Sequence, residues 1–320
     1  MAAPGAHGNK AVVAALIGNS GIAVAKFVGF LLTRSSAMLA EAIHSVADAG
    51  NQALLLLGGK RARQLADDEH QFGYGRERYF WSFVVALILF ALGSAFAVYE
   101  GIEKIRHPHA ISNVPIALGI LGFGILLESW SFRTAIKEAR PLKGSLTWWQ
   151  FIRRSRTPEL PVVLLEDLGA QAGLCIAFVA IVISKVFDAP IWDGIGTLTI
   201  GLLLGVIAVI LVIEMRSLLL GEGARSGEMK KIVDAIESSP EVTHLIHIRT
   251  QHLGPDELLV GAKVAFDTEL TVAELAEAID RVEAAVRAEV PYAHPMYIEP
   301  DLMRDIDKIR AGEPTQDPTH

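Results

Sequence analysis

The chain has 320 residues, of which 51% are hydrophobic and 20% are charged, with a formal net charge of −7 at pH 7. This apolar fraction is high for a soluble protein, and the negative charge argues against a nucleic-acid partner. The single cysteine, Cys175, excludes a disulfide framework and a cysteine-rich zinc site, and its apolar neighbours predict that it is buried and inert. The composition indicates a membrane protein whose apolar residues are collected into spans.

Six segments are apolar over about the 20 residues that a helix needs to cross a bilayer. They are residues 11–32, 37–57, 80–102, 114–132, 162–186 and 191–220. The polar start, residues 1–10, lacks the basic region and cleavage site of a signal peptide, so we treat the first apolar run as a span of the mature protein. The sequence therefore predicts an integral, multi-pass membrane protein with a six-helix transmembrane domain over residues 1–220.

Basic residues are distributed unevenly over the connections between these spans. The second and fourth connections carry Lys60, Arg61, Arg63, Arg76, Arg78, Arg133, Lys137, Arg140, Lys143, Arg153, Arg154 and Arg156. The opposite side carries Arg34, Lys104, Arg106 and Lys185. By the positive-inside rule, both termini are expected in the cytoplasm. Residues 141–160, which include Trp148 and Trp149, are either an amphipathic segment at the cytoplasmic interface or a solvated basic loop.

The pattern changes after residue 220. Residues 229–238 have helical spacing, residues 242–251 and 258–266 alternate as strands, residues 272–290 form an amphipathic helix, and residues 296–298 form a last strand. This order predicts a small cytoplasmic α+β domain of the ferredoxin-like type over residues 221–302. The polar end, residues 303–320, is expected to be disordered.

Two ionisable residues stand out in the second span. His44 and Asp48 are four residues apart, so a helix places them on one face, one turn apart. An ionisable residue inside a membrane helix is costly and commonly marks a pathway or a site. An imidazole and a carboxylate one turn apart are half of a tetrahedral site for zinc or a similar divalent ion. The alternative is a structural hydrogen-bonded pair, but a bound cation would better offset the burial of the carboxylate.

No motif indicates an enzyme or an ATP-driven pump. A Walker-type glycine-rich loop is absent from the sequence, so ATP has no support as an energy source and an ion gradient is the expected one. No nucleophile–base constellation is evident either, and no prosthetic group is expected.

Three stretches resemble a known family. They are residues 40–48, residues 67–76, and residues 99–104 followed by His107-Pro108. Together with six spans and an α+β tail, they resemble the cation diffusion facilitators, which export divalent metals such as zinc by proton antiport. The resemblance covers residues 10–302. It implies a homodimer in a lipid bilayer that exchanges protons for a divalent ion, with zinc as the first choice and manganese, iron, cobalt or cadmium as alternatives.

The resemblance also implies ligands in the fifth span. Asp167 matches the aspartate of the family's second His/Asp-x-x-x-Asp pair, but the position four residues earlier is Val163, which cannot bind metal. The matched ligands are therefore His44, Asp48 and Asp167. The region around Trp81 and the pair Glu166-Asp167 also resemble the subgroup with the mitochondrial and nuclear-associated zinc transporters.

The fourth ligand position is left open by Val163. Gln171 is one turn after Asp167 on the same helix face, whereas Glu166 is about 100° round the helix. Asn51 and water are further alternatives. Charge favours Glu166, because a third carboxylate would balance a divalent ion beside a neutral imidazole and a carboxylate facing lipid needs a purpose. Glu166 could meet that need as an outer-shell proton acceptor as well.

A second function class remains possible for a chain with this vacancy. It is a transport-inactive, metal-sensing or scaffolding membrane protein that acts through its tail domain. In the tail, the family's metal-binding histidine positions read Ile246, Lys263 and Tyr297, while His244, His247 and His252 are out of register. We therefore expect the family's tail metal site to be absent. In the loop after the second span, Asp67 and His70 match a weak family metal site, although a polar loop is the simpler interpretation.

Overall fold

The computed structural model describes residues 9–33, 36–87, 91–109 and 114–303, without the side chains of some helical residues, among them His44. The chain divides into two compact units, Met1–Leu219 and Leu220–His320. The predicted disordered end, residues 303–320, lies outside the described residues from residue 304 onward. Each unit is described by itself.

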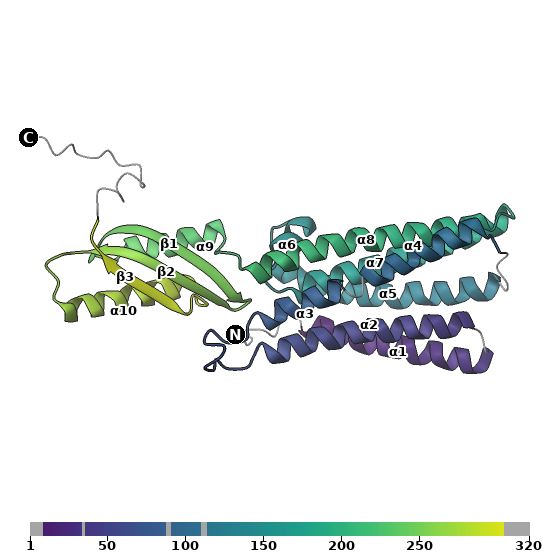
Figure 1. The fold of residues 1–320 in the computed structure, drawn as a ribbon, viewed down its shortest axis with the longest axis horizontal. Helices are drawn as coiled ribbons and strands as arrows, with labels where there is room; N and C mark the ends of the chain where they lie inside the picture. Colours follow the sequence, from purple (N-terminus) through teal and green to yellow (C-terminus); the bar gives the residue numbers. More distant parts are fainter. Residues whose placement is uncertain (1–8, 34–35, 88–90, 110–113, 304–320) are drawn as a thin grey trace, which may run out of the picture. The chain divides into compact units, whose positions relative to one another are not determined.

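The first unit consists of helices. They are α1 (Asn9–Thr33), α2 (Ser36–Arg61), α3 (Glu77–Val85), α4 (Ala91–Arg106), α5 (Val114–Lys143), α6 (Trp148–Arg154), α7 (Glu159–Val186) and α8 (Ile191–Leu220) (Figure 1). Each of the six predicted spans is occupied by helix, with the third divided between α3 and α4. One detail differs from the expectation, because α5 continues beyond residue 132. Within residues 141–160, for which an amphipathic segment and a loop were both left open, part of the chain forms the helix α6.

The membrane character of this unit follows from its longest helices. Within the described residues, α5, α7 and α8 are long and apolar enough to cross a membrane, and α8 has the highest mean hydropathy, 2.7. Their outer surfaces are apolar as well, since Leu126 is 70% and Val206 is 59% exposed. Cys175 is also exposed on α7, so the expectation that it is buried in protein was wrong. In a membrane protein, apolar neighbours in sequence can face lipid as readily as the core.

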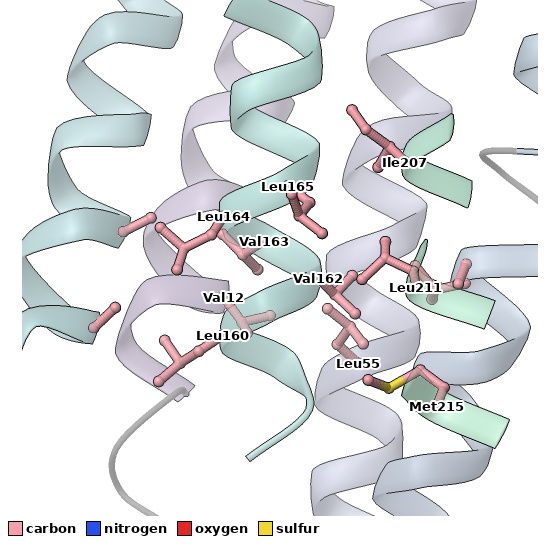
Figure 2. Packing of buried hydrophobic residues seen from close by; sticks show 14 of the residues in the cluster. Val12, Leu55, Leu160, Val162, Val163, Leu164, Leu165, Ile207, Leu211 and Met215 are labelled. Atoms are coloured by element: carbon pink, nitrogen blue, oxygen red, sulfur yellow. The ribbon is translucent and has the colours of Figure 1, made fainter. Parts of the chain in front are cut away.

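The core of the unit surrounds the first half of α7. Val162, Val163, Leu164 and Leu165 are consecutive and all buried, so this part of the helix has no exposed side. Figure 2 shows them packed among residues of other helices, including Val12 of α1, Leu55 of α2 and Leu211 of α8. A helix that is apolar on every side belongs in the interior of a bundle. Any polar residue on this stretch of α7 is therefore buried as well.

Helices α4 and α8 pack unusually closely, and Figure 1 shows them side by side. A Cβ atom on Gly201 of α8 would lie 2.7 Å from the backbone nitrogen of Val98, and one on Gly194 would lie 2.8 Å from that of Ile105. Small residues at such a seam let two membrane helices approach each other. At one end of the seam, Lys104 Nζ lies 3.1 Å from Asp193 Oδ2.

A buried ion pair joins α3 to the start of α7. Arg78 Nε donates to Glu159 Oε1 at 2.6 Å, with side-chain exposures of 7% and 2%. Glu159 lies in the first turn of α7, where the helix dipole also favours a negative charge. The pair fixes α7 at its beginning, about two turns before Glu166 and Asp167.

The second unit is the predicted α+β domain. Its elements are α9 (Ser226–Glu237), β1 (Val242–Gly254), β2 (Glu257–Phe266), α10 (Val272–Glu289) and β3 (Met296–Asp301). The three strands are ordered β1-β2-β3, with β1 antiparallel and β3 parallel to β2. A parallel pair needs a crossover, which α10 supplies. Ile232 of α9 and Val282 of α10 share one core with Val260 and Val264 of β2.

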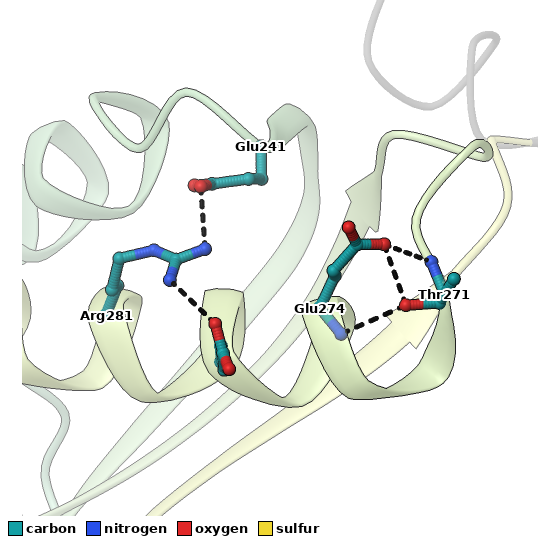
Figure 3. A network of polar contacts seen from close by, with 5 residues as sticks. Glu241, Thr271, Glu274 and Arg281 are labelled. Carbon is teal, nitrogen blue, oxygen red and sulfur yellow. Dashed lines mark hydrogen bonds and ion pairs between the residues drawn. The ribbon is translucent and has the colours of Figure 1, made fainter.

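Polar contacts fix α10 at its beginning and middle (Figure 3). Thr271 and Glu274 form a capping box, in which each side chain accepts a hydrogen bond from the other residue's backbone N–H. Arg281 Nη2 donates to Glu241 Oε1 at 2.7 Å, which joins α10 to the turn before β1. A capping box of this kind stabilises a helix by about 1 kcal/mol. With its own core and caps, this unit is built to fold by itself.

We predict that the Arg78–Glu159 pair supports the whole bundle. Arg78→Met should lower stability by about 3–5 kcal/mol, because it leaves a carboxylate buried without its counter-ion. The double variant Arg78→Met/Glu159→Gln should recover part of this loss, because it removes the uncompensated charge. Thermal unfolding of the full chain in detergent measures both. A double variant that is less stable than Arg78→Met alone would contradict this account.

Candidate metal site in the helix bundle

The predicted site residues lie on α2 and α7. On α7, Glu166 and Asp167 are only 8% and 3% exposed, and on α2 Asp48 is half-buried. Asp48 and Asp167 both lie close enough to Glu166 to act on it electrostatically. The side chain of His44 lies outside the described residues. Glu166 and Asp167 are therefore buried in the bundle, and the charge of Asp48 on α2 acts on both.

Glu166 points toward α2. Asn51 Nδ2 donates to Glu166 Oε1 at 3.2 Å, and Gln52 also lies against this carboxylate. The second oxygen, Oε2, is buried and has no hydrogen-bond partner of good geometry among the described residues. Gln52 in turn accepts from Asn19 Nδ2 of α1 at 3.3 Å. A chain of polar side chains thus runs from α1 through α2 to the carboxylate on α7.

Asp167 points toward α5 instead. Its Oδ2 accepts from Ser131 Oγ at 3.1 Å, and Glu128 of the same helix acts on it electrostatically. Neighbouring residues on a helix are separated by about 100°, so Glu166 and Asp167 reach different helices. The charge of Asp48 nevertheless acts on Asp167, although less strongly than the charge of Glu128.

Gln171 lies on the α5 side of α7. Its Oε1 accepts from Ser129 Oγ at 3.3 Å, and its Nε2 lies 3.9 Å from Cys175 Sγ. Neither contact is with Glu166 or with a residue of α2. As the spacing predicts, it shares a face of α7 with Asp167, and both side chains contact serines of α5.

The described residues alone do not form a complete coordination site. No group of three or more His, Cys, Asp or Glu side chains among them is close enough to hold a metal ion. The imidazole of His44 is not among these side chains. What the structure does show is a pair of buried carboxylates, Glu166 and Asp167, of which Glu166 Oε2 has no hydrogen-bond partner of good geometry among the described residues.

Sequence reasoning did not identify three polar neighbours of the site. Gln52 is one turn after Asp48 on α2, Asn19 lies on α1, and Ser131 lies on α5. The spacing of Gln52 from Asp48 was a usable signal, since both lie on one helix face. Asn19 and Ser131 have no such relation to a site residue in sequence. Only the packing of four helices brings them together.

The loop after α2 is held by its own polar contacts. The Asp67 carboxylate accepts from the Tyr74 hydroxyl at 2.7 Å and from the backbone N–H of His70 at 2.7 Å. The Tyr74 hydroxyl, followed by these backbone donors, lowers the pKa of Asp67. The His70 and Tyr74 rings are 4.4 Å apart. These contacts support the polar-loop interpretation.

In the tail, Lys263 of β2 lies between acidic side chains. It is paired in the sheet with His247 of β1 and Glu299 of β3. Its Nζ lies 2.8 Å from Asp301 Oδ2 and 3.2 Å from Glu299 Oε1. These two carboxylates raise the pKa of Lys263.

Two family models cover nearly the whole chain. The model described as the cation efflux transmembrane domain matches residues 12–220, and the model described as the cation efflux protein, cytoplasmic domain, matches residues 224–301. The chain belongs to the cation efflux family, with a helical transmembrane domain followed by a cytoplasmic α+β domain.

Several curated proteins are similar to the chain. Metal tolerance protein C4 of Arabidopsis thaliana is 31% identical over 87% of this chain and 62% of its own length. The mitochondrial proton-coupled zinc antiporter SLC30A9 of Mus musculus is 31% identical over 81% of this chain and 46% of its own length. The chain thus spans about half to three fifths of these two relatives. The magnetosome protein MamM of Magnetospirillum gryphiswaldense is 25% identical over 82% of this chain and 78% of its own length.

The solved structure titled MamM-CTD 215-293 is 25% identical to the chain, covers 24% of this chain and 96% of its own, and has a TM-score of 0.23.

We predict that the tail domain folds without metal and that Lys263 keeps zinc out. An isolated domain of residues 221–303 should show no stoichiometric zinc binding by calorimetry at neutral pH. Lys263→Ala should acquire zinc binding, because His247, Glu299 and Asp301 then lose the ammonium between them. The matched control is Lys231→Ala, which removes a surface pair with Glu289. Tight zinc binding by the unaltered domain would contradict the prediction.

Proposed function

We propose that this protein exports a divalent metal cation across a membrane in exchange for protons, with zinc as its main substrate. Asp48 and Asp167, together with His44, would bind the ion between α2 and α7. The observation that supports the proposal is the burial of Glu166 and Asp167 in a membrane domain, where the charge of Asp48 acts on both. The metal is a transported substrate, and we propose no prosthetic group.

The burial of these carboxylates is the physical argument for a cation. Among the described residues, no Lys or Arg forms an ion pair with Glu166 or Asp167. Neighbouring carboxylates of like charge in a low-dielectric interior oppose each other's ionisation. A divalent cation or protons would remove that repulsion. The same groups can thus hold a metal ion in one state and protons in another.

Competition for these groups is the basis for antiport. Carboxylates and imidazoles bind metal only when they are deprotonated, so metal and protons exclude each other from one site. The imidazole of a histidine such as His44 titrates near neutral pH, which suits exchange between compartments. The similarity to a protein named as a proton-coupled zinc antiporter supports this mechanism.

Glu166 is the residue that we propose for the vacancy left by Val163. Its carboxylate points toward α2, which carries Asp48, and its Oε2 has no hydrogen-bond partner of good geometry in the part of the chain that the structure describes. Gln171 uses its polar atoms on the α5 side. A site of three carboxylates and one imidazole is rich in oxygen, so manganese and iron are the strongest competitors of zinc, ahead of cobalt and cadmium.

The membrane arrangement is also part of the proposal. The charge distribution supports cytoplasmic termini. The cytoplasmic domain of this family supports a homodimer formed through the tail. Because Lys263 provides an internal positive charge, that dimer would form without metal in the tail.

The alternative, a transport-inactive sensor or scaffold, rested on the absence of a ligand at Val163. In the structure, Val163 is 1% exposed and packs in the core around α7. Its identity is therefore explained by packing and does not require that transport has been lost. The alternative retains no observation of its own.

We predict that Asp48→Ala abolishes transport. Zinc flux into proteoliposomes with an imposed pH gradient should fall to background, because a ligand and its charge are lost. Asp67→Ala is the matched control, since Asp67 is a carboxylate of an exposed loop. It should transport normally. Wild-type flux in Asp48→Ala at equal protein abundance would refute the assignment.

We predict that Glu166→Gln reduces flux at least tenfold, whereas Gln171→Leu stays within about twofold of the wild type. Glu166 is adjacent to Asp167 and contacts α2, whereas Gln171 is one turn after Asp167 and contacts α5. The comparison of the two variants therefore distinguishes the two faces of α7. Normal flux in Glu166→Gln with loss in Gln171→Leu would move the site to the α5 side. Normal flux in both variants would leave water as the fourth ligand.

A further inference from the structure

A basic and aromatic surface lies where α5 leaves the membrane. We call it the α5–α6 surface, and it consists of Arg133, Lys137 and Arg140 of α5 with Trp148 and Trp149 of α6. All five residues are exposed. The proposed transport mechanism makes no use of this surface, and the argument below does not depend on that mechanism.

The length of α5 sets the depth of these residues. The apolar part of the helix runs from Val114 to Phe132, and at 1.5 Å per residue it spans about 28 Å. The hydrocarbon core of a bilayer is about 30 Å thick, so Arg133 begins the headgroup layer. Lys137 and Arg140 follow within about 10 Å along the axis, which is the depth of phosphate groups and the water just beyond them.

The three cations form one stripe. Positions 133, 137 and 140 are spaced by four and three residues, which places them on a single face of the helix. The opposite face is buried, with Ala135 at 2% and Ala139 at 0% exposure. The stripe therefore points away from the protein. The acidic residue of this segment, Glu138, is half-buried and lies off the stripe.

Helix α6 adds two indoles to the surface. Its beginning is fixed by a capping box between Thr147 and Gln150, and Phe151 anchors it in the core at 3% exposure. Trp148 and Trp149 are left 38% and 52% exposed. Such amphipathic rings are typical of the boundary between lipid and water.

Each indole also has a cation beside it. Lys143 Nζ lies 5.5 Å from the centre of the Trp148 ring, and the Arg153 guanidinium lies 6.0 Å from that of Trp149. Arg153 additionally pairs with Glu214 of α8 at 3.1 Å, which holds it in place. The two indoles are thus already oriented in the free protein, so less of their side-chain freedom remains to be lost on binding.

From this arrangement we infer that the α5–α6 surface binds the phosphate headgroups of anionic lipids in the adjoining leaflet. The stripe supplies charge at the depth of the phosphates, and the indoles supply contact with the glycerol and upper acyl region. A lipid is the fitting occupant because the surface continues directly from a membrane span. Its net charge is positive in a chain whose overall charge is −7.

The test is quenching of tryptophan fluorescence by brominated lipids in nanodiscs that contain the full chain. Brominated phosphatidylglycerol is compared with brominated phosphatidylcholine at equal mole fraction. The difference between the wild type and Trp148→Phe/Trp149→Phe isolates the signal of the two indoles. We expect the anionic lipid to quench that signal about fivefold more strongly, the effect of roughly one fully effective charge near an anionic surface.

The charge dependence decides the outcome. Arg133→Gln/Lys137→Gln/Arg140→Gln should bring the ratio of the two quenching constants close to one, and so should raising salt to 1 M in the wild type, since the screening length falls to about 3 Å. The matched control, Lys230→Gln/Lys231→Gln/Arg249→Gln, removes three exposed charges from the tail and should keep the wild-type ratio.

Three results would overturn the inference. One is an equal response to both lipids in the wild type. Another is a preference that survives both 1 M salt and the loss of the α5 stripe. A third is quenching that is equal for the two headgroups but changes with the protein-to-lipid ratio. That result would indicate that the surface contacts a second copy of the chain. The salt titration keeps the test decisive if the triple variant fails to fold.

Discussion

The burial of the first half of α7 on every side is the constraint on which the rest of the membrane domain depends. From Leu160 to Leu165 the helix is apolar all round, and the other helices pack against it. The Arg78–Glu159 pair fixes its beginning. The two acidic residues that follow have no exposed side to turn to, so the fold must provide polar partners for both.

These partners come from two different helices, because adjacent side chains on α7 point in different directions. Glu166 meets the amides of α2, while Asp167 meets the hydroxyl of Ser131 on α5. Two neighbouring amides of α2 pair across the bundle, Asn51 with Glu166 of α7 and Gln52 with Asn19 of α1. The same side chains that stabilise the bundle thereby line the place where a cation would rest. Under the proposed function, stability and ion binding would share one set of contacts, and a change of state at the site would affect α1, α2, α5 and α7.

The tail domain follows a different rule. Its three-stranded sheet and two helices enclose a core of their own. Outside that core, Lys263 pairs with the carboxylates of Glu299 and Asp301, so these acidic side chains lie beside a positive charge of the chain itself.

The sequence by itself determined the helices and strands, because hydrophobic period and length carry that information locally. Six apolar runs and the α–β–β–α–β order of the tail all appear where the pattern places them. It also determined the relation of His44 to Asp48 and of Asp167 to Gln171, since both follow from 3.6 residues per turn. Tertiary structure alone decided which helix each carboxylate faces, because that depends on packing between distant segments. Asn19 and Ser131 join the site only through the contacts of α1 and α5, and Cys175 faces outward because, in a membrane, an apolar environment is lipid as well as protein.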